Sequence, residues 1–282
     1  MLPLSDADFT RLYTYVKAHY GIDLSKKKML ISSRLTNMLI QEGYRDFTQY
    51  TAEIISGRHP DMISAMLNRL TTNYTYFLRE KDHFDFLKQT VLPQLAARHA
   101  HDHSLAIWSA GCSSGEEPYT ISMYLREFFD EQPGTWDTRI LATDISEHVL
   151  SSAKKPSYGA EALAELPKTW QQKYFIPTEN GNYTVTPQLR KNVIFQPFNL
   201  MEPIRFRRKF DLIFCRNVMI YFDQSTKEAL IRRFYEATAA GGYLFIGHSE
   251  GLDKDSCPYH YLKPAIYQKQ PAPGNLQGGD TP

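Results

Sequence analysis

The sequence predicts an α/β protein in which a small all-helical domain precedes a doubly wound, mostly parallel sheet with a small inserted β-subdomain. Two observations predict the sheet. From Leu105 onward, apolar runs of strand length alternate with helix-like segments, a pattern typical of parallel sheets. The first run enters a turn of small residues, from Gly111 to Gly115, which leads directly into a helix-like segment. Such a turn lets a ligand approach backbone N–H groups, because no side chain stands in the way.

Residues 1–70 predict four short helices, each with apolar residues at helical spacing. Ser5 or Asp6 can cap the first helix, and Ser25 can cap the second. The helices are separated by residues that end or interrupt helices, namely Gly21, Gly43, Gly57 and Pro60.

Basic residues are concentrated in this helical region. The whole chain carries 32 Lys and Arg against 31 Asp and Glu, so its net charge gives no indication of nucleic-acid binding. Within the helical region, however, cations exceed anions, and Lys27 and Arg34 are predicted to share one face of the second helix. This excess predicts an acidic partner that docks there. A solvated surface is the alternative explanation, and the commoner one for such clusters.

Residues 71–100 are interpreted as a linker followed by a helix. Thr, Asn and Tyr dominate Leu70–Glu80, and such residues weaken helices through local hydrogen bonds. The helix is expected at about Lys81–His99. Three histidines follow closely without a second cluster of ligands, so we interpret them as a polar loop and predict no metal site: His99, His101 and His103.

Five parallel strands are predicted next, followed by an antiparallel edge strand at Tyr261–Gln268. The parallel strands are Leu105–Ser109, Arg139–Thr143, Val193–Pro197, Phe210–Cys215 and Tyr243–Gly247. Gly241 and Gly242 are expected to form the turn into the last of them.

The region at about 157–191 interrupts the alternation of strands and helices. Tyr174–Ile176 and Tyr183–Val185 flank Glu179–Asn182, a glycine-containing stretch typical of a hairpin turn. We therefore predict a small β-subdomain. We expect it at the same edge of the sheet as the ligand that the small-residue turn would admit. Residues 270–282 are rich in Pro and Gly and are expected to be disordered.

The predicted strand ends also indicate which cofactor is bound. Asp144 follows the second strand, at the position where an acid holds the two ribose hydroxyls of a nucleoside. The turn has only Gly111 and Gly115, whereas a dinucleotide site needs three glycines. Glu116 and Glu117 then open the helix, where they would repel a diphosphate and attract a cation such as the sulfonium of S-adenosylmethionine. Alternatively, the two acids only complement the helix dipole.

Composition indicates the compartment. The three cysteines are odd in number and lack metal-ligand spacing, which indicates a reducing cytoplasm. No apolar run approaches the ~18 residues of a membrane span, and the start lacks the basic head and apolar run of a signal peptide. We therefore expect a cytoplasmic protein. A monomer is favoured, because no extra apolar helix is evident.

Four motifs in order carry a family resemblance. They are Thr71–Glu80, Trp108–Tyr119, Phe214–Phe222 and Gly247–Glu250. In sequence and spacing they resemble the CheR-type chemotaxis receptor methyltransferases, protein-glutamate O-methyltransferases, and the match spans roughly Ser5 to Lys269. The resemblance implies a sheet of the S-adenosylmethionine-dependent methyltransferase type. It also implies transfer of methyl groups to glutamates on the cytoplasmic helical bundle of bacterial chemoreceptors, giving glutamate methyl esters and S-adenosylhomocysteine.

The resemblance further implies site residues. Those expected to bind the cofactor are Asn73, Thr75, Arg79, Glu116, Asp144, Asn199, Leu200, Cys215, Arg216 and Asn217. Tyr221 is expected near the transferred methyl group, and Arg79 is a second candidate for steering the substrate carboxylate. The implied domains are 1–70 for receptor docking, 71–100 for the linker and helix, and 101–269 for methyl transfer. Some members grip a receptor's C-terminal peptide with the β-subdomain, which the short hairpin loop here argues against.

The implied reaction suits the side chains present. A glutamate carboxylate, with a pKa near 4.3, is already ionised and needs no general base, and no Asp–His or Cys–His arrangement is evident. Two alternatives stay open: a methyltransferase acting on a small molecule or RNA, and a non-catalytic adaptor that senses the cofactor. The sequence has no Asp-Pro-Pro-Tyr motif and no basic stripe in its α/β half, so nucleic acid is not an expected partner.

Overall fold

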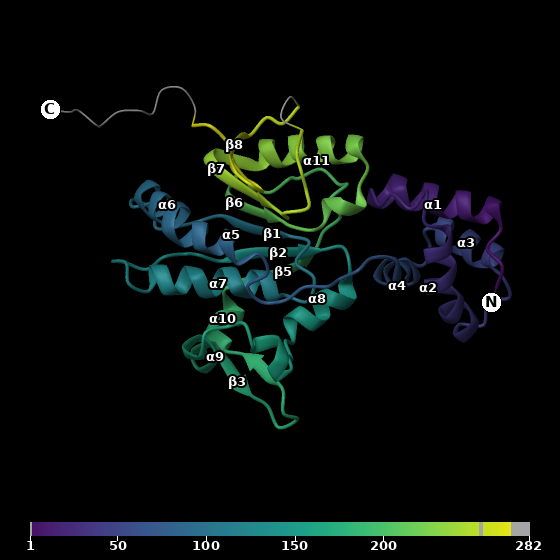
Figure 1. Cartoon of the computed structure of the whole chain (residues 1–282), viewed down its shortest axis with the longest axis horizontal. Coiled ribbons are helices and arrows are strands. Elements are labelled where there is room, and N and C mark those ends of the chain that lie inside the picture. Colours follow the sequence, from purple (N-terminus) through teal and green to yellow (C-terminus); the bar gives the residue numbers. More distant parts are fainter. Residues whose placement is uncertain (1, 254–255, 272–282) are drawn as a thin grey trace.

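The structure is a computed structural model that describes residues 2–253 and 256–271. A helical N-terminal domain lies beside a layered α/β domain, from which a small hairpin subdomain projects (Figure 1). The fold class predicted from the sequence is confirmed. Most of the predicted tail, residues 270–282, lies outside the described residues.

Four helices form the N-terminal domain, as predicted: α1 (Asp6–Tyr20), α2 (Lys28–Gln41), α3 (Phe47–Ser56) and α4 (Pro60–Leu70). The Ser5 hydroxyl accepts a hydrogen bond from the backbone N–H of Asp8 and caps α1, and Gly21 ends α1 in the left-handed conformation. The predicted cap at Ser25 is wrong. Ser25 lies in a turn, where its N–H donates to Asp23, and α2 begins three residues later without a side-chain cap.

The linker leads into one long helical segment. This segment comprises α5 (Lys81–Phe86), a π-helical turn (Leu87–Val91) and α6 (Leu92–Arg98), in agreement with the predicted helix. Pro93 lies two residues after the end of the π turn and has no N–H to continue the regular α-helical hydrogen bonds.

Seven strands form the main sheet, in the order β5-β2-β1-β6-β7-β9-β8. They are β1 (Ile107–Ala110), β2 (Ile140–Asp144), β5 (Val193–Pro197), β6 (Phe210–Cys215), β7 (Thr238–Ile246), β8 (His260–Lys263) and β9 (Ile266–Gln268). The first five in spatial order run parallel, and β9 and β8 are antiparallel additions at one edge. The predicted single edge strand is therefore a hairpin, which turns at Ala265 with a positive φ of 62°.

A second difference concerns Gly241 and Gly242. They do not form a turn before the strand but lie within β7, which starts at Thr238. The pairing register between β6 and β7 shifts between Phe210 and Leu212, so the extra β7 residues around the glycines are accommodated as an irregularity.

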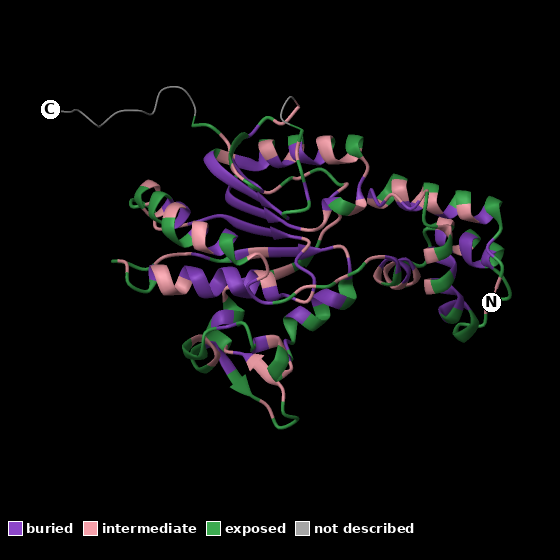
Figure 2. Ribbon diagram, viewed as in Figure 1, coloured by how far each residue is buried: buried purple, intermediate pink, exposed green. Residues whose placement is uncertain are grey.

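Helices cover both faces of the sheet (Figure 1), and its central strands are buried (Figure 2). The strand side chains alternate between two cores. Trp108 and Ile213 face α11 (Gln224–Ala237), while Ile107 and Leu212 belong to the core formed with α5, α6 and α7 (Glu116–Phe129). Helix α8 (Glu147–Lys154) packs on β2 and β5 and also contacts α4, which connects it to the helical domain.

The inserted subdomain contains the predicted hairpin, β3 (Phe175–Pro177) and β4 (Tyr183–Val185). Its other elements are a 3₁₀ turn (Ala160–Leu163), α9 (Lys168–Tyr174) and α10 (Pro187–Lys191). Tyr158 fixes this unit to the β1–α7 turn, because its hydroxyl donates to the Ser114 carbonyl at 3.0 Å. Its ring and that of Phe175 also pack against Phe77 of the linker.

None of the helices in 2–253 and 256–271 is both long and apolar enough to cross a bilayer.

Buried tyrosines predict a loss of stability at high pH. Burial raises the pKa of four of them to about 12: Tyr20, Tyr44, Tyr124 and Tyr174. An unfolded tyrosine ionises near pH 10, so between pH 10 and 12 the unfolded state loses protons that the native state keeps. The free energy of unfolding should therefore fall as pH rises from 10 to 12. Urea denaturation at pH 8, 10 and 11 measures this slope.

Tyr124→Phe provides the matched variant for that measurement, because it removes one buried hydroxyl and keeps the ring. Its free energy of unfolding should fall less steeply above pH 10 than that of the wild type. An identical slope in both proteins would show that Tyr124 does not contribute.

Candidate functional site

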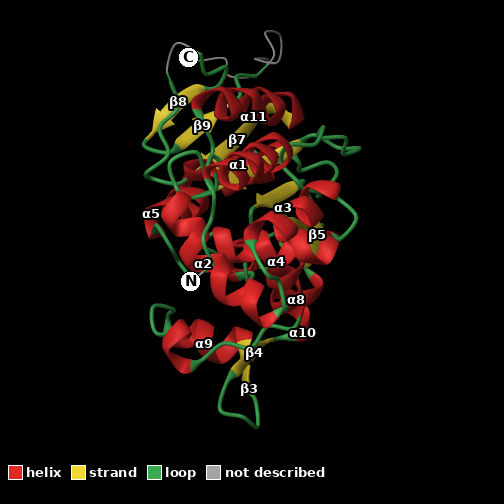
Figure 3. Cartoon of the chain, turned by 90° about the vertical axis from the view of Figure 1, so that its right-hand side faces the viewer, coloured by secondary structure: helices red, strands yellow, loops and turns green. Residues whose placement is uncertain are grey.

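A cavity lies at the carboxyl ends of β1, β2 and β6. The space among its lining residues is about 980 Å³, including the part open to solvent. The linker (residues 71–80) covers it, and the helical domain borders it: Figure 3 shows α1–α4 in front of the sheet. Nine of the residues implied by the family resemblance line it: Asn73, Thr75, Arg79, Asp144, Asn199, Leu200, Arg216, Asn217 and Tyr221.

The turn between β1 and α7 forms one wall. Gly111 has a φ of +86°, and a Cβ there would lie 2.3 Å from the Val218 side chain, so only glycine fits. The N–H groups of Gly111 and Cys112 both donate to the Thr143 carbonyl, at 2.7 and 2.9 Å. These contacts bring the ends of β1, β2 and β6 close together.

Asp144 is the buried acid at the end of β2. It accepts hydrogen bonds from the N–H groups of Ser113 and Ser146, both at 2.9 Å. Burial raises the pKa of this carboxyl group, against the opposing effect of these bonds. Two carboxylate oxygens offer about four acceptor positions, so acceptors remain for a ligand's hydroxyl groups.

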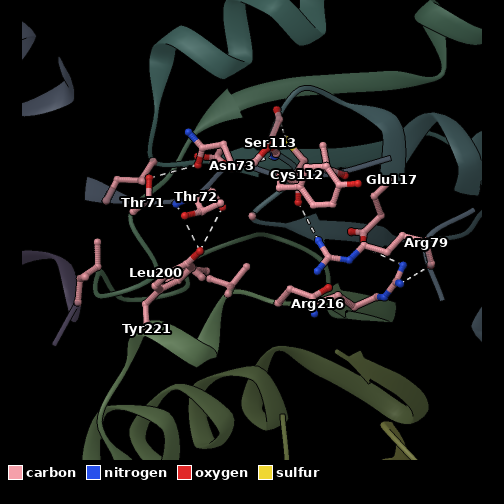
Figure 4. A pocket seen from close by; sticks show the side chains of 18 of the residues that line it. Thr71, Thr72, Asn73, Arg79, Cys112, Ser113, Glu117, Leu200, Arg216 and Tyr221 are labelled. Carbon is pink, nitrogen blue, oxygen red and sulfur yellow. Dashed lines mark hydrogen bonds and ion pairs between the residues drawn. The ribbon is translucent and has the colours of Figure 1, made fainter. Parts of the chain in front are cut away.

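Arg216 connects three parts of the site (Figure 4). Its guanidinium group is buried and donates to Glu117 at 3.2 Å, to Glu80 at 3.1 Å and to the Arg79 carbonyl. It also lies over the Phe84 ring, 5.4 Å from the centroid. Arg216 therefore joins the end of β6, the start of α7 and the end of the linker.

Glu117, and not Glu116, is the acid that lines the cavity. It accepts from the Ser109 hydroxyl at 2.7 Å as well as from Arg216, and burial raises its pKa. Glu116 accepts instead from the Ser114 hydroxyl. Consecutive helical residues point about 100° apart, so only one of the two can face the cavity. Glu117 is therefore the one of the two that borders the cavity, and the expected contact of Glu116 with the cofactor stays a prediction.

Cys215 is the last residue of β6, directly before Arg216, and its side chain does not line the cavity. It is completely buried in the core shared with α11, so its expected contact with the cofactor stays a prediction. Burial accordingly raises its thiol pKa. Alternation along the strand places Cys215 on one face and its neighbour at the site.

Hydrogen bonds hold the linker residues in place over the cavity. The Asn73 carbonyl accepts from the Ser113 hydroxyl at 2.8 Å, which joins the linker to the β1–α7 turn. Arg79 donates to the Tyr74 carbonyl at 2.8 Å, and its guanidinium lies 5.8 Å from the centre of the Tyr76 ring. Thr75 lines the cavity between them.

The segment after β5 forms the opposite wall. Leu200 supplies apolar surface, together with Ile145 and Phe198. The Asn199 side chain donates to the His19 carbonyl at 2.7 Å and thereby reaches the helical domain.

Tyr221 lies at the end of a 3₁₀ turn (Met219–Tyr221). Its hydroxyl donates to the Thr72 carbonyl at 3.1 Å and accepts from the Thr72 N–H at 3.4 Å. The preceding turn starts at Asn217, whose φ is +59°. The buried carboxylate of Glu250 supports this turn, because it accepts from the N–H groups of Asn217 and Ile220 at 2.8 and 3.2 Å.

The roles of four other residues at this site were not predicted from the sequence. Glu250 was part of a quoted motif, but no role followed from its sequence. Tyr20 and Ile22 line the cavity from the helical domain, and no periodicity or spacing signal indicates this. Glu80 follows Arg79 directly, and its pairing with Arg216 depends on a long-range contact.

The two residues predicted for partner docking differ in their surroundings. Lys27 is exposed and immediately precedes α2. Arg34 donates to the carbonyls of Arg69, Leu70 and Thr71 at 3.0–3.2 Å, and so caps the end of α4. Lys27 is thus the N-cap of α2, and its carbonyl accepts from the Ile31 N–H at 3.0 Å, whereas the Arg34 side chain is engaged at the end of α4. The docking role of both residues stays a prediction.

The fold and the cavity together define a class of protein. A mostly parallel sheet carries a buried acid at the end of β2, an apolar wall at Leu200 and a second acid, Glu117, opposite. This donor set fits a nucleoside with a cationic end group, and the small turn at Gly111 lacks the third glycine of dinucleotide sites. The class is that of the S-adenosylmethionine-dependent methyltransferases.

Comparison with known proteins identifies the family. The model described as "CheR methyltransferase, SAM binding domain" matches residues 73–266, and "CheR methyltransferase, all-alpha domain" matches residues 7–71. A chemotaxis protein methyltransferase of Borreliella burgdorferi is 41% identical, over 93% of this chain and 94% of its own. One of Escherichia coli is 39% identical, over 89% and 86%. The chain belongs to the CheR methyltransferase family, as its motifs predicted.

Proposed function

We propose that the protein transfers the methyl group of S-adenosylmethionine to glutamate side chains in the cytoplasmic helical bundle of bacterial chemoreceptors. The products are glutamate methyl esters and S-adenosylhomocysteine. One observation carries the proposal: Tyr20 and Ile22 of the helical domain line the same cavity as Asp144 and Tyr221. A protein docked on the helical domain is thus next to the groups that would position its carboxylate.

The cavity residues have complementary tasks in holding the cofactor. Asp144 would accept hydrogen bonds from the ribose hydroxyls, Leu200 would offer an apolar surface to the adenine, and Glu117 would suit the positively charged end. Asn73, Thr75 and Arg79 cover the cofactor from the linker. When bound, the cofactor supplies a methyl group activated by its positive sulfur.

The remaining residues orient the substrate and exclude water. The carboxylate needs no base, so the protein's task is to align it with the methyl group, which can supply ~7–11 kcal/mol. Tyr221 and Arg79 are the residues proposed to orient it. A negative nucleophile and a positive electrophile give neutral products, so the covering linker also favours the reaction by excluding water.

Methylation of receptor-rich membranes with radiolabelled cofactor tests the proposal. We expect label in the receptor band, released by mild base, because carboxyl methyl esters are labile and N-methyl groups are not. Label in RNA, or base-stable label, would support a methyltransferase of another specificity. Cofactor binding without transfer to any receptor would support the adaptor. Both results contradict the proposal.

Tyr221→Phe tests the orienting hydroxyl. A hydrogen bond to a charged group contributes about 1.5–3 kcal/mol, so kcat should fall about 10- to 100-fold. The cofactor Kd should stay within about threefold, because the ring is kept. Unchanged kcat with intact binding would remove Tyr221 from the mechanism.

Lys27→Glu tests docking on the helical domain. Lys26 and Lys27 are exposed, and among the described residues neither has an ion-pair partner, whereas Lys28 pairs with Asp6 at 2.6 Å. Exposed pairs contribute about 0.2–1 kcal/mol, so KM for receptor should rise about two- to fivefold and the difference should shrink with added salt.

Lys88→Glu is the matched control for Lys27→Glu, because it reverses an exposed lysine between α5 and α6. Figure 1 shows these two helices on the side of the sheet domain that faces away from the helical domain. Its KM should stay unchanged. Equal kinetics for both variants would place docking elsewhere. Arg34 is unsuitable for this test, since its loss also uncaps α4.

The same proposal includes a cytoplasmic location, a monomeric enzyme and no nucleic-acid partner. Its support is the cytoplasmic position of the substrate bundle and the nearly balanced charge of the chain.

A further inference from the structure

Two histidines and a glutamate meet beside the cavity, although they lie far apart in the sequence. Glu80 ends the linker, His83 lies in the first turn of α5, and His248 follows β7. One ligand atom from each lies within 4.8 Å of the other two. The two imidazole rings are 4.6 Å apart between centroids.

His83 is the unusual member of this group. Its side chain is completely buried, and neither ring nitrogen has a hydrogen-bond partner among the described residues. Buried polar groups normally have such partners, because leaving one without a partner costs free energy. We interpret the unpartnered Nδ1, which lies toward Glu80, as the position of a missing ligand.

The spacing between His83 and Glu80 suits a metal ion. His83 Nδ1 lies 3.5 Å from Glu80 Oε2, without forming a hydrogen bond. Zinc bonds of about 2.0–2.2 Å at a tetrahedral angle place two ligand atoms roughly 3.4 Å apart. The pair is thus already spaced as two ligands of one tetrahedral ion.

We propose that Glu80, His83 and His248 bind a divalent transition-metal ion of the zinc type. Two imidazoles and one carboxylate form a donor set that such ions favour, with water completing the coordination. Asp82 is the nearest outer partner, because its Oδ2 lies 3.2 Å from His248 Nε2.

The surrounding charges permit a cation here. Glu80, Asp82 and Glu117 carry three carboxyl groups, against the two guanidinium groups of Arg216 and Arg79. Arg216 contacts Glu80 but keeps Glu117 and the Arg79 carbonyl as acceptors if Glu80 binds the ion.

Sequence analysis predicted no metal site, because the obvious histidines at 99–103 lacked a second ligand cluster. Those histidines have other contacts: His99 pairs with Asp211 at 2.8 Å, and His103 stacks on Trp136. The proposed ion would join the end of the linker to the end of β7, two segments with no local sequence relation.

Cobalt titration of the full chain, with any affinity tag removed, tests the site. Tetrahedral Co²⁺ absorbs visible light strongly, so one equivalent should produce a saturable band that added Zn²⁺ abolishes. His248→Ala should weaken Co²⁺ binding more than the ~10- to 100-fold typical of losing an outer partner, because it removes a direct ligand. His248 is partly exposed, so the variant should fold.

His101→Ala is the matched control, since it removes an exposed histidine from the loop near 99–103. It should bind Co²⁺ as the wild type does, and Glu80→Gln should bind weakly. Thermal unfolding of each variant confirms that it is folded. The proposal is overturned if the wild type shows no band at millimolar Co²⁺, or if His248→Ala keeps wild-type affinity.

Discussion

Arg216→Ala is expected to abolish most methyl transfer and to lower the free energy of unfolding by about 3–5 kcal/mol. The side chain is buried and pairs with Glu80 and Glu117, whose side chains are only 14% and 13% exposed. Its removal leaves two poorly solvated carboxylates without the guanidinium that pairs with both. The linker also loses its connection to the end of β6, because Arg216 donates to the Arg79 carbonyl.

Urea denaturation and receptor methylation measure the two effects. Arg126→Ala is the control, because Arg126 forms an exposed pair with Asp130 on α7 that should contribute at most about 0.5 kcal/mol. Arg216→Lys restores the charge without the forked geometry, so it should recover part of the stability. If Arg216→Ala unfolds like Arg126→Ala, the guanidinium does not hold the site together.

Asp144→Asn is expected to weaken cofactor binding about 10- to 100-fold. A carboxylate that accepts hydroxyl hydrogen bonds gains about 1.5–3 kcal/mol from its charge, and each 1.36 kcal/mol is tenfold in affinity. The asparagine amide presents one acceptor oxygen in place of two, so it loses either a ribose contact or a backbone contact to Ser113 or Ser146.

Titration calorimetry with S-adenosylhomocysteine measures this loss without turnover. Glu147→Gln is the matched control, since Glu147 is an exposed acid three residues further on, at the start of α8. Its affinity should equal that of the wild type. Wild-type affinity in Asp144→Asn, with the fold intact by circular dichroism, would remove Asp144 from the cofactor site.

Local chemistry explains which elements could be predicted. The strand at Val193–Pro197 and the helix ended by Gly21 follow from apolar spacing and from backbone conformations that few residues adopt. Asp144 was placed correctly at the cavity because the carboxyl ends of parallel strands meet at one edge of a sheet.

The features that the sequence left undetermined depend on side-chain orientation and on distant contacts. Glu116 and Cys215 each stand next to a residue that lines the cavity, and only the exact rotation of a helix or strand decides between neighbours. The sequence predicts Arg34 as a surface cation, because its contact with the end of α4 depends on the tertiary fold. Nothing in the sequence indicates a binding role for His83, because His248, which lies beside it in the structure, is far away in the sequence.

The cavity wall contributed by the helical domain links two affinities. Tyr20 and Ile22 belong to the domain proposed to meet the receptor, yet they border the space for the cofactor. If a docked receptor tightens the junction held by Lys17 with Asp223 and by Asn199, the cofactor binds more strongly. Reciprocity then requires the cofactor to strengthen receptor binding by the same factor. The ratio of receptor affinities with and without cofactor therefore measures the coupling between the cofactor site and the helical domain.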